Sequence, residues 1–343
     1  MGVSSSKPHP IATKWFPKFE ENLPSLAGKT VVITGCTSGT GYIVARTAAR
    51  KGAENILLLN RPSSRATEAE QSLNAVAAGT TTTTNRSNIE TIPCDLQDFE
   101  SVKQAARTII AKYEAVDVLC NNAGVMALED KATKDGYDVQ IQTNHLSHFL
   151  LTKELYPLLK RAAELRGEAR VANHTSEARL AQNRNLQEEY FGKNGGNLGG
   201  DGASMFFGGA RWVRYQQSKL ANSVFTMALR DHFGDDSGIK ATVAHPGLAA
   251  TNLQVTTAST GGMGSGMWIM RLGQSQEDGS MPICAACFDP TAENGSFWAP
   301  SKMGGLRGPA KKIAVDKLSL NEQSRKMLWE KSEEACRERF DCN

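Results

Sequence analysis

The feature of this sequence that most constrains its fold is a regular alternation, from residue 29 onward, of short apolar runs with longer amphipathic stretches. Several runs are apolar throughout, which is typical of strands buried on both faces of a parallel sheet. Helical periodicity is found at Tyr42–Lys51, Ser101–Tyr113 and Lys219–Phe233. The pattern predicts an α/β fold with a doubly wound parallel sheet. The expected strands are Thr30–Thr34, Asn55–Asn60, Ile89–Cys94, Val116–Asn121, Arg170–Thr175 and Lys240–His245, with a seventh near Gly295–Pro300.

Three segments interrupt this rhythm, at Ala78–Ser87, Asn183–Arg214 and Thr251–Gln276. The second is rich in Gly and Asn, and we expect it to be a long loop insert, because loops of this length in compact domains are usually functional. We expect a single domain at residues 28–310, after an N-terminal extension at 1–27. Residues 311–343 form a helical segment that packs on the same domain, with a closing helix at Leu318–Cys336.

The charge and cysteine content narrow the class of protein. The 343 residues hold 39 basic and 36 acidic side chains, and a net charge of +3 indicates no strong field for nucleic acid. The longest apolar runs, such as Ile56–Leu59, are far shorter than the roughly 20 residues of a membrane span. Seven irregularly spaced cysteines without a signal peptide read as reduced intracellular thiols, and no metal-ligand cluster is expected.

The first six residues, Met1 to Ser6, fit the pattern for N-myristoylation at Gly2. The alternative is a polar, irregular start that merely contains a glycine. One myristoyl chain gives only marginal, reversible membrane binding, of order ~10⁴ M⁻¹. The expected location is therefore the cytoplasm, either free or peripheral on a membrane.

The segment Thr30–Gly41 reads as a strand, a glycine-rich turn and the start of a helix. Gly35 permits the tight turn, Gly39 allows backbone to approach a pyrophosphate, and Gly41 allows close packing of helix on strand. The free N–H groups of the helix N-terminus favour an anion. These features predict a dinucleotide site, with Thr37, Ser38 and Thr40 in the same turn.

The end of the second expected strand bears on the choice of dinucleotide. An NAD site places an acid here for the ribose 2′-OH, but this chain has Asn60 followed by Arg61. A cation at this place suits a 2′-phosphate. The sequence therefore predicts NADP(H) rather than NAD(H), the alternative being that Arg61 only faces solvent.

Four motifs in order give the chain a resemblance to the short-chain dehydrogenase/reductase family. They are the glycine triplet, Asn121-Asn122-Ala123-Gly124, the Tyr215-x-x-x-Lys219 pair and Pro246-Gly247. Segments 143–152 and 218–222 are similar to the retinol dehydrogenase-like branch, and 199–209 resembles the related protochlorophyllide reductases. The resemblance covers about residues 28–253 and implies a Rossmann fold and oxidoreductase activity.

The resemblance implies Tyr215 as the catalytic acid or base. Lys219 lies four residues on, so the two share a helix face, and its ammonium should lower the pKa of the phenol. Ser176 is expected to donate a hydrogen bond to the substrate carbonyl, with Thr175 as the alternative. Asn144 is expected to support a water-linked proton path from Lys219.

The same resemblance completes the cofactor site. It places Asp95 and Leu96 near the adenine, and Asn122, Ala123 and Gly124 along the adenosine ribose. It places Pro246, Gly247 and Thr251 near the nicotinamide.

The leading functional prediction is an NADP(H)-dependent oxidoreductase that interconverts a carbonyl and an alcohol on an apolar small molecule, such as a retinoid, a steroid or a lipid aldehyde. One alternative is a C=C reductase of the protochlorophyllide reductase type. Another is a nucleotide-binding regulator with little turnover. A homo-oligomer is left open. The apolar substrate is inferred from Met263, Met267, Trp268, Met270, Phe206 and Phe207 in the two long loops.

Overall fold

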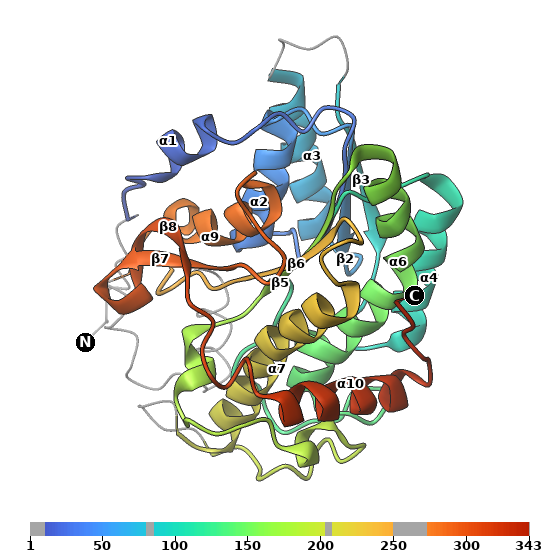
Figure 1. Cartoon of the computed structure of the whole chain (residues 1–343), viewed down its shortest axis with the longest axis vertical. Coiled ribbons are helices and arrows are strands. Elements are labelled where there is room, and N and C mark those ends of the chain that lie inside the picture. Colours follow the sequence, from blue (N-terminus) through green and yellow to red (C-terminus); the bar gives the residue numbers. More distant parts are fainter. Residues whose placement is uncertain (1–10, 80–85, 203–207, 250–272, 343) are drawn as a thin grey trace, which may run out of the picture.

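The computed structural model describes residues 11–79, 86–202, 208–249 and 273–342, and these form an α/β domain around one eight-stranded sheet (Figure 1). The strand order is β3-β2-β1-β4-β5-β6-β7-β8. Strands β1 to β7 are parallel, and β8 runs antiparallel to β7 as a hairpin at the sheet edge. The strands are β1 Thr30–Thr34, β2 Asn55–Asn60, β3 Asn88–Pro93, β4 Val118–Asn121, β5 Ala169–His174, β6 Ile239–Ala244, β7 Phe297–Lys302 and β8 Arg307–Ile313.

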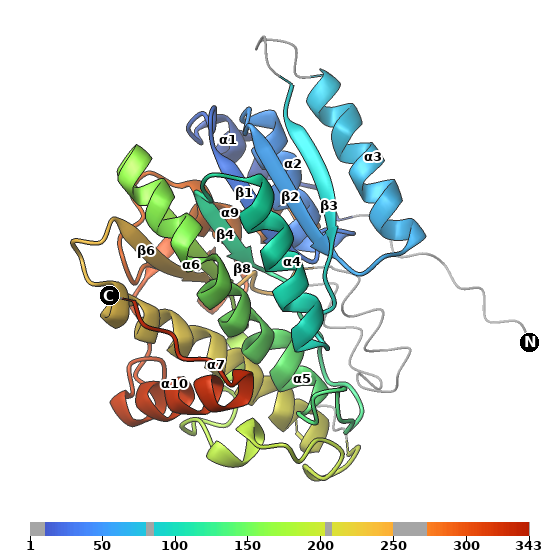
Figure 2. The same ribbon diagram turned by 90° about the vertical axis from the view of Figure 1, so that its right-hand side faces the viewer.

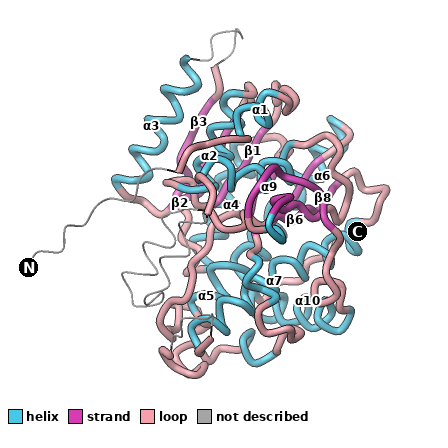
Figure 3. Tube along the Cα trace, turned by 90° about the vertical axis from the view of Figure 1, so that its left-hand side faces the viewer, coloured by secondary structure: helices cyan, strands magenta, loops and turns pink. Residues whose placement is uncertain are grey.

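Helices cover both faces of the sheet, as the continuous apolar strands require. On one face lie α2 (Gly39–Arg50), α3 (Ser64–Gly79) and α9 (Gln276–Phe288), with α1 (Phe16–Glu21) against α9 (Figure 3). On the other lie α4 (Phe99–Lys112), α6 (Ser147–Arg166) and α7 (Ala210–Phe233) (Figure 2). Helix α10 (Glu322–Cys336) packs across α7. The short elements are α5 (Val139–Ile141), a π-helical turn at Gln142–Leu146, and 3₁₀ turns at Glu177–Leu180, Glu188–Phe191 and Met303–Gly305.

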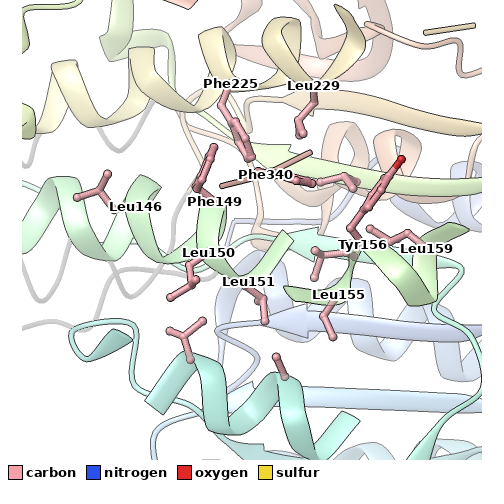
Figure 4. Packing of buried hydrophobic residues seen from close by; sticks show 14 of the residues in the cluster. Leu146, Phe149, Leu150, Leu151, Leu155, Tyr156, Leu159, Phe225, Leu229 and Phe340 are labelled. Carbon is pink, nitrogen blue, oxygen red and sulfur yellow. The ribbon is translucent and has the colours of Figure 1, made fainter. Parts of the chain in front are cut away.

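The larger core cluster joins the C-terminal segment to the helical layer that carries α7. Phe149 of α6 lies 5.5 Å from Phe225 of α7 and 5.7 Å from Phe340, measured between ring centroids (Figure 4). Trp329 of α10 contacts the same group, with its ring 5.2 Å from that of Phe149. The residues after Ile313 therefore pack on the sheet domain against α7. The predicted helical segment from 311 is corrected in two respects, because residues 311–313 belong to β8 and the closing helix starts at Glu322, not Leu318.

The order of the strands fixes where a ligand site can lie. The chain winds from β1 outward to β3, then returns to place β4 on the other side of β1. In open α/β sheets, a crevice for ligands forms outside the carboxyl ends of the strands at such a switch point. The ends of β1, β4 and β5 are therefore where the functional residues should meet.

The predicted fold class is confirmed, and the predicted strands differ from the observed ones by at most two residues at each end. The exception to the prediction is β8, a basic strand with Pro309 that has no apolar run to reveal it. Helix α7 starts at Ala210, nine residues before the predicted helical range, so the end of the expected insert is helical. Within the described residues, no helix is long and apolar enough to cross a membrane.

Candidate active site

Tyr215 and Lys219 lie one turn apart on α7, and both side chains are buried. Burial raises the pKa of Tyr215 to about 12, against a lowering effect of its hydrogen bond with Ser176. Burial also lowers the pKa of Lys219 to about 8, which is still above neutral pH. The expected lowering of the tyrosine pKa is therefore not seen, because desolvation of the phenolate outweighs the hydrogen bond with Ser176. At neutral pH Tyr215 holds its proton.

The strand β5 ends at His174, and the next two residues face α7 in different ways. Thr175 donates its hydroxyl to the Lys219 carbonyl at 2.6 Å, so its proton is committed to the helix backbone. Ser176 Oγ accepts from the Ala178 N–H at 3.2 Å and forms the bond with Tyr215. Of the two hydroxyls, that of Ser176 is the one placed beside the phenol.

Asn144 lies in the π-helical turn between α5 and α6. Its side-chain oxygen accepts from the Val125 N–H at 2.7 Å, and its amide donates to the Val125 carbonyl and to Ser218 Oγ. Ser218 in turn donates to the Tyr215 carbonyl at 2.7 Å. A Cβ on Gly124 would lie 3.0 Å from Lys219 Nζ and 3.1 Å from the Asn144 oxygen, so Gly124 keeps the space between them open.

The glycine-rich turn has the geometry that its sequence predicts. Gly35 and Gly39 have positive φ of 73° and 71°. A Cβ on Gly41 would lie 2.3 Å from the Gly35 carbonyl, so only glycine permits this contact between helix and turn. Ser38 is the N-cap of α2 in extended backbone and makes no side-chain cap bond. The first N–H groups of α2 are thus presented toward the crevice, beside Thr37 and Thr40.

Asn122 is the centre of a hydrogen-bond network that sequence reasoning missed. Its amide donates to the carbonyls of Thr34 and Gly35, at 2.9 and 3.3 Å. Its oxygen accepts from Thr40 Oγ1 at 2.7 Å and lies 3.0 Å from His174 Nδ1. The side chain thus joins the ends of β1, β4 and β5 to the start of α2. The resemblance places Asn122 along a ribose, but its side chain is engaged within the protein, and its backbone N–H donates to Thr34 Oγ1 at 3.0 Å.

Asn60 is also used internally, because its side-chain oxygen accepts from the Cys36 N–H at 2.8 Å and braces the glycine-rich turn. Arg61 directly after it is exposed at the surface. Asp95 follows β3, and its carboxylate accepts from the Gln97 N–H at 3.0 Å. Leu96 is buried, and its carbonyl accepts from Ser147 at 2.6 Å. Ala123 packs against Gly35.

The loop after β6 holds Pro246 and Gly247. Gly247 has a φ of 63°, and a Cβ there would lie 2.4 Å from the Leu306 carbonyl. His245 before it lies 3.0 Å from Glu177, the neighbour of Ser176. This contact joins the two loops and, with Arg179, lowers the pKa of Glu177 to about 2. Thr251, Gly2 and the six apolar loop residues from which we infer an apolar substrate lie outside the described residues.

Arg214, next to Tyr215, anchors the insert and was not singled out by the sequence. Its guanidinium is 1% exposed and donates to the carbonyls of Leu198, Gly200 and Leu128 at 2.8–3.2 Å. It also lies 3.2 Å from the Asp138 carboxylate and 3.7 Å from that of Asp130.

Asp130 completes this anchor from the other side. It accepts from the backbone N–H groups of Gly196, Leu198 and Gly200 at 2.7–2.9 Å. The described part of the insert is therefore tied to the helix of the catalytic pair through two buried charges of opposite sign.

The sequence comparisons identify the class of protein. A family model described as short chain dehydrogenase matches residues 29–188. A short-chain dehydrogenase/reductase of Armillaria gallica is 32% identical over 253 residues, which span 73% of this chain and 74% of the relative. The chain belongs to the short-chain dehydrogenase/reductase family.

Within that family the chain is retinol dehydrogenase-like. It is 32% identical to human retinol dehydrogenase 13 over 229 residues, 67% of this chain and 61% of the relative. It is 37% identical over 240 residues to an uncharacterized oxidoreductase of Schizosaccharomyces pombe, 69% of this chain and 65% of the relative. The chain thus spans less than two thirds of the length of these two relatives.

Solved structures show the same fold. An uncharacterized protein from Mycobacterium paratuberculosis superimposes with a TM-score of 0.69 at 28% identity, over 94% of this chain and 98% of that one. An NADPH-bound carbonyl reductase from chicken fatty liver gives a TM-score of 0.54 at 20% identity, over 79% of this chain and 96% of that one. The second comparison shows a shared fold.

Proposed function

We propose that the protein is an NADP(H)-dependent reductase that converts a carbonyl on an apolar small molecule to an alcohol. The observation that carries the proposal is the buried, protonated phenol of Tyr215, hydrogen-bonded to Ser176 and one helical turn from the charged Lys219. With a pKa raised to about 12, the phenol carries its proton at neutral pH, as the acid of a carbonyl reduction must.

In the proposed reaction, reduced NADP supplies a hydride to the carbonyl carbon, and this chain supplies the proton. Ser176 and Tyr215 donate hydrogen bonds to the carbonyl oxygen, where negative charge develops. Tyr215 then transfers its proton to that oxygen. Lys219 stabilises the resulting phenolate by its charge, and Asn144 fixes the backbone of Val125 and the hydroxyl of Ser218 around the pair.

The glycine-rich turn fits a dinucleotide. The helix α2 presents its first N–H groups without a side-chain cap, and a Cβ on Gly39 would meet nothing closer than Gln276 at 3.6 Å. The backbone there can be approached by a pyrophosphate. Arg61 is exposed at the end of β2, where a 2′-phosphate would be read, and Asp95 and Leu96 lie at the end of β3. NADPH bound to the chicken carbonyl reductase supports the same choice.

An apolar substrate and attachment to the cytoplasmic side of a membrane through an acylated Gly2 are part of the proposal. They are supported by the apolar residues of the two long loops, by the N-terminal sequence and by the likeness to a retinol dehydrogenase.

The experiment has two stages. Titration with NADPH and with NADH, followed by nicotinamide fluorescence, should give clearly tighter binding of NADPH. NADPH oxidation is then measured with retinal, a steroid ketone, a long-chain aldehyde and small water-soluble carbonyls. Turnover of lipophilic carbonyls supports the proposal. Turnover of only soluble carbonyls contradicts the substrate class, and binding of neither dinucleotide contradicts the whole proposal.

A further inference from the structure

The turn of the β7–β8 hairpin carries an unusual surface. Met303 is 54% exposed and Leu306 is 40% exposed. The other large apolar side chains of the described residues with more than a third of their surface exposed are Ile110, Leu165 and Leu320, which lie far apart in the chain. Single exposed apolar side chains are normal on a protein surface. Met303 and Leu306 instead lie within four residues of each other and form a local apolar projection.

The backbone of this turn holds the projection in place. Met303 has a φ of +51°, followed by Gly304 at +64° and Gly305 at +92°. A non-glycine residue in the left-handed region is uncommon and strained, and such strain is concentrated at functional sites. Glycine would suit the position of Met303 better, yet the chain places a long apolar side chain there and points it toward solvent.

Three cations lie around Trp15, two of them from the hairpin that carries the apolar projection. The ring of Trp15 lies within 6 Å of all three: Lys14 at 5.3 Å, Lys302 at 5.5 Å and Arg307 at 5.9 Å. Within the described part of the chain, none of these three cations forms an ion pair with a carboxylate. Figure 1 shows the hairpin and the described start of the chain on the same side of the molecule.

The position of the turn relates it to the candidate active site. The Leu248 N–H donates to the Leu306 carbonyl at 2.8 Å, and the Gly308 N–H donates to Gln274 Oε1 at 2.9 Å. The Leu306 carbonyl also lies directly against Gly247, where a Cβ would be only 2.4 Å from it. A surface that binds at this turn would therefore lie beside the loop that follows Pro246.

We propose that Trp15, Lys14, Lys302, Met303, Leu306 and Arg307 form a docking surface for a bilayer that contains anionic phospholipid. The charge is complementary to lipid phosphate, Trp15 is of the kind found at membrane interfaces, and Met303 and Leu306 can enter the acyl boundary. The residues before Lys14 add Lys7 and no acid. Since a single acyl chain holds a protein only marginally, this surface would be the second signal needed for firm attachment.

The test measures co-sedimentation of the full chain with vesicles of phosphatidylcholine alone and of phosphatidylcholine with phosphatidylserine. A Gly2→Ala background removes any contribution of acylation. At about 0.1 M salt, where the Debye length is about 10 Å, we expect binding only to the phosphatidylserine vesicles. Each cation near an anionic membrane strengthens binding by about fivefold, so Lys302→Glu with Arg307→Glu should weaken it at least tenfold. Met303→Ser with Leu306→Ser should weaken it comparably.

Two control variants make the result specific. Lys160→Glu with Lys326→Glu makes the same change in net charge at exposed lysines of α6 and α10, and Ile110→Ser with Leu165→Ser removes equally exposed apolar side chains. Both should bind as the parent does. Controls that weaken binding as much as the hairpin variants would overturn the proposal, as would a parent chain that binds neither vesicle. The docking surface is independent of catalysis, so NADPH-dependent turnover in solution should be unchanged by the hairpin variants.

Discussion

The two sides of the candidate site are built differently. On the cofactor side, the ends of β1, β4 and β5 are joined by uncharged side chains, with Asn122 and Asn60 bracing the glycine-rich turn through short hydrogen bonds. On the substrate side, the described insert is held to α7 by the buried charges of Arg214 and Asp130. Neutral hydrogen bonds fix the glycine-rich turn, where we propose the dinucleotide binds. A buried ion pair fixes the described insert, which we propose borders the substrate.

The largest expected effect concerns the proton donor between these sides. Tyr215→Phe should lower the rate of carbonyl reduction by about 10³-fold, within the usual range for loss of a general acid, and should leave NADPH binding unchanged. Single-turnover kinetics and the fluorescence titration check the two parts. Tyr137→Phe, a second buried tyrosine, is the control and should retain activity. Unchanged turnover in Tyr215→Phe would exclude the proposed acid, and loss of both properties would indicate misfolding.

The next effect tests the cofactor side. Gly41→Ala would place a Cβ 2.3 Å from the Gly35 carbonyl and should weaken NADPH binding by about a hundredfold or more, because the turn must move and a 1 Å displacement can have that effect. Gly79→Ala, whose Cβ would meet nothing within 4 Å, should bind normally. Normal binding by Gly41→Ala would show that the turn is more adaptable than its contacts suggest.

On the substrate side, Arg214→Met should destabilise the protein by about 3 kcal/mol, because it leaves two buried carboxylates without their partner. Where the variant folds, KM for the carbonyl should rise while NADPH binding stays the same. Arg214→Lys keeps the charge but not the forked donors, so it should recover only part of both properties. Thermal melts and steady-state kinetics provide the readout. If NADPH binding weakened as much as KM rose, the cofactor side and the substrate side would not be independent of each other.

The pH dependence of stability should report on the buried histidines, of which His174 and His148 lie on the cofactor side and His145, whose pKa burial lowers to about 3, packs against Phe225. Burial lowers the pKa of His174 to about 3 and that of His148 to about 4, whereas in an unfolded chain each would titrate near 6.5. Below pH 6.5 these histidines bind protons in the unfolded state but not in the folded state. The free energy of unfolding therefore falls as the pH drops toward the lowered pKa values. Each group contributes about 1.4 kcal/mol per pH unit. Urea titrations between pH 7 and about 5 should show this slope.

The matched variant for that titration is His174→Asn. This variant should be less stable at pH 7, because His174 is bonded to Asn122. The slope of its unfolding free energy against pH should be smaller by the uptake of about one proton, which is about 1.4 kcal/mol per pH unit. An unchanged slope would mean that His174 does not stay neutral in the folded protein.

The smallest effect concerns Arg61. Arg61→Ser should weaken NADPH binding by about tenfold, equivalent to about 1.4 kcal/mol, and leave NADH binding unchanged. The same change at the exposed Arg86 is the control and should affect neither dinucleotide. Equal losses for both dinucleotides would show that Arg61 does not read a 2′-phosphate.

Much of the fold could be predicted from the sequence because its signals are local. A continuous apolar strand such as Val31 to Ile33 next to a glycine-rich turn indicates its own secondary structure and burial. The spacing of Tyr215 and Lys219 likewise puts them on one helix face. β8 has no such local signal, since an edge strand rich in lysine and with a proline looks like a loop.

The contacts within the site could not be predicted, because they depend on residues that meet only after folding. The four partners of Asn122 come from two strand ends, those of β1 and β5, and from the start of α2. An arginine such as Arg214 usually faces water, and only the folded insert encloses it. The pKa of Tyr215 was expected to fall, since the sequence shows the nearby lysine but not the burial that raises it.

The π-helical turn at Gln142–Leu146 gives the site an uneven tolerance to mutation. The Ser147 N–H bonds to the Gln142 carbonyl five residues back, so the turn holds one more residue than an α-helix would. Substitutions there can keep the extra residue, but deletion of one would restore the α-helical spacing. The side chains before the deletion would then be turned by about 100° relative to α6, and Asn144 would lose Val125 and Ser218. Within this stretch the number of residues is thus more tightly constrained than their identity, which a scan of substitutions alone would not detect.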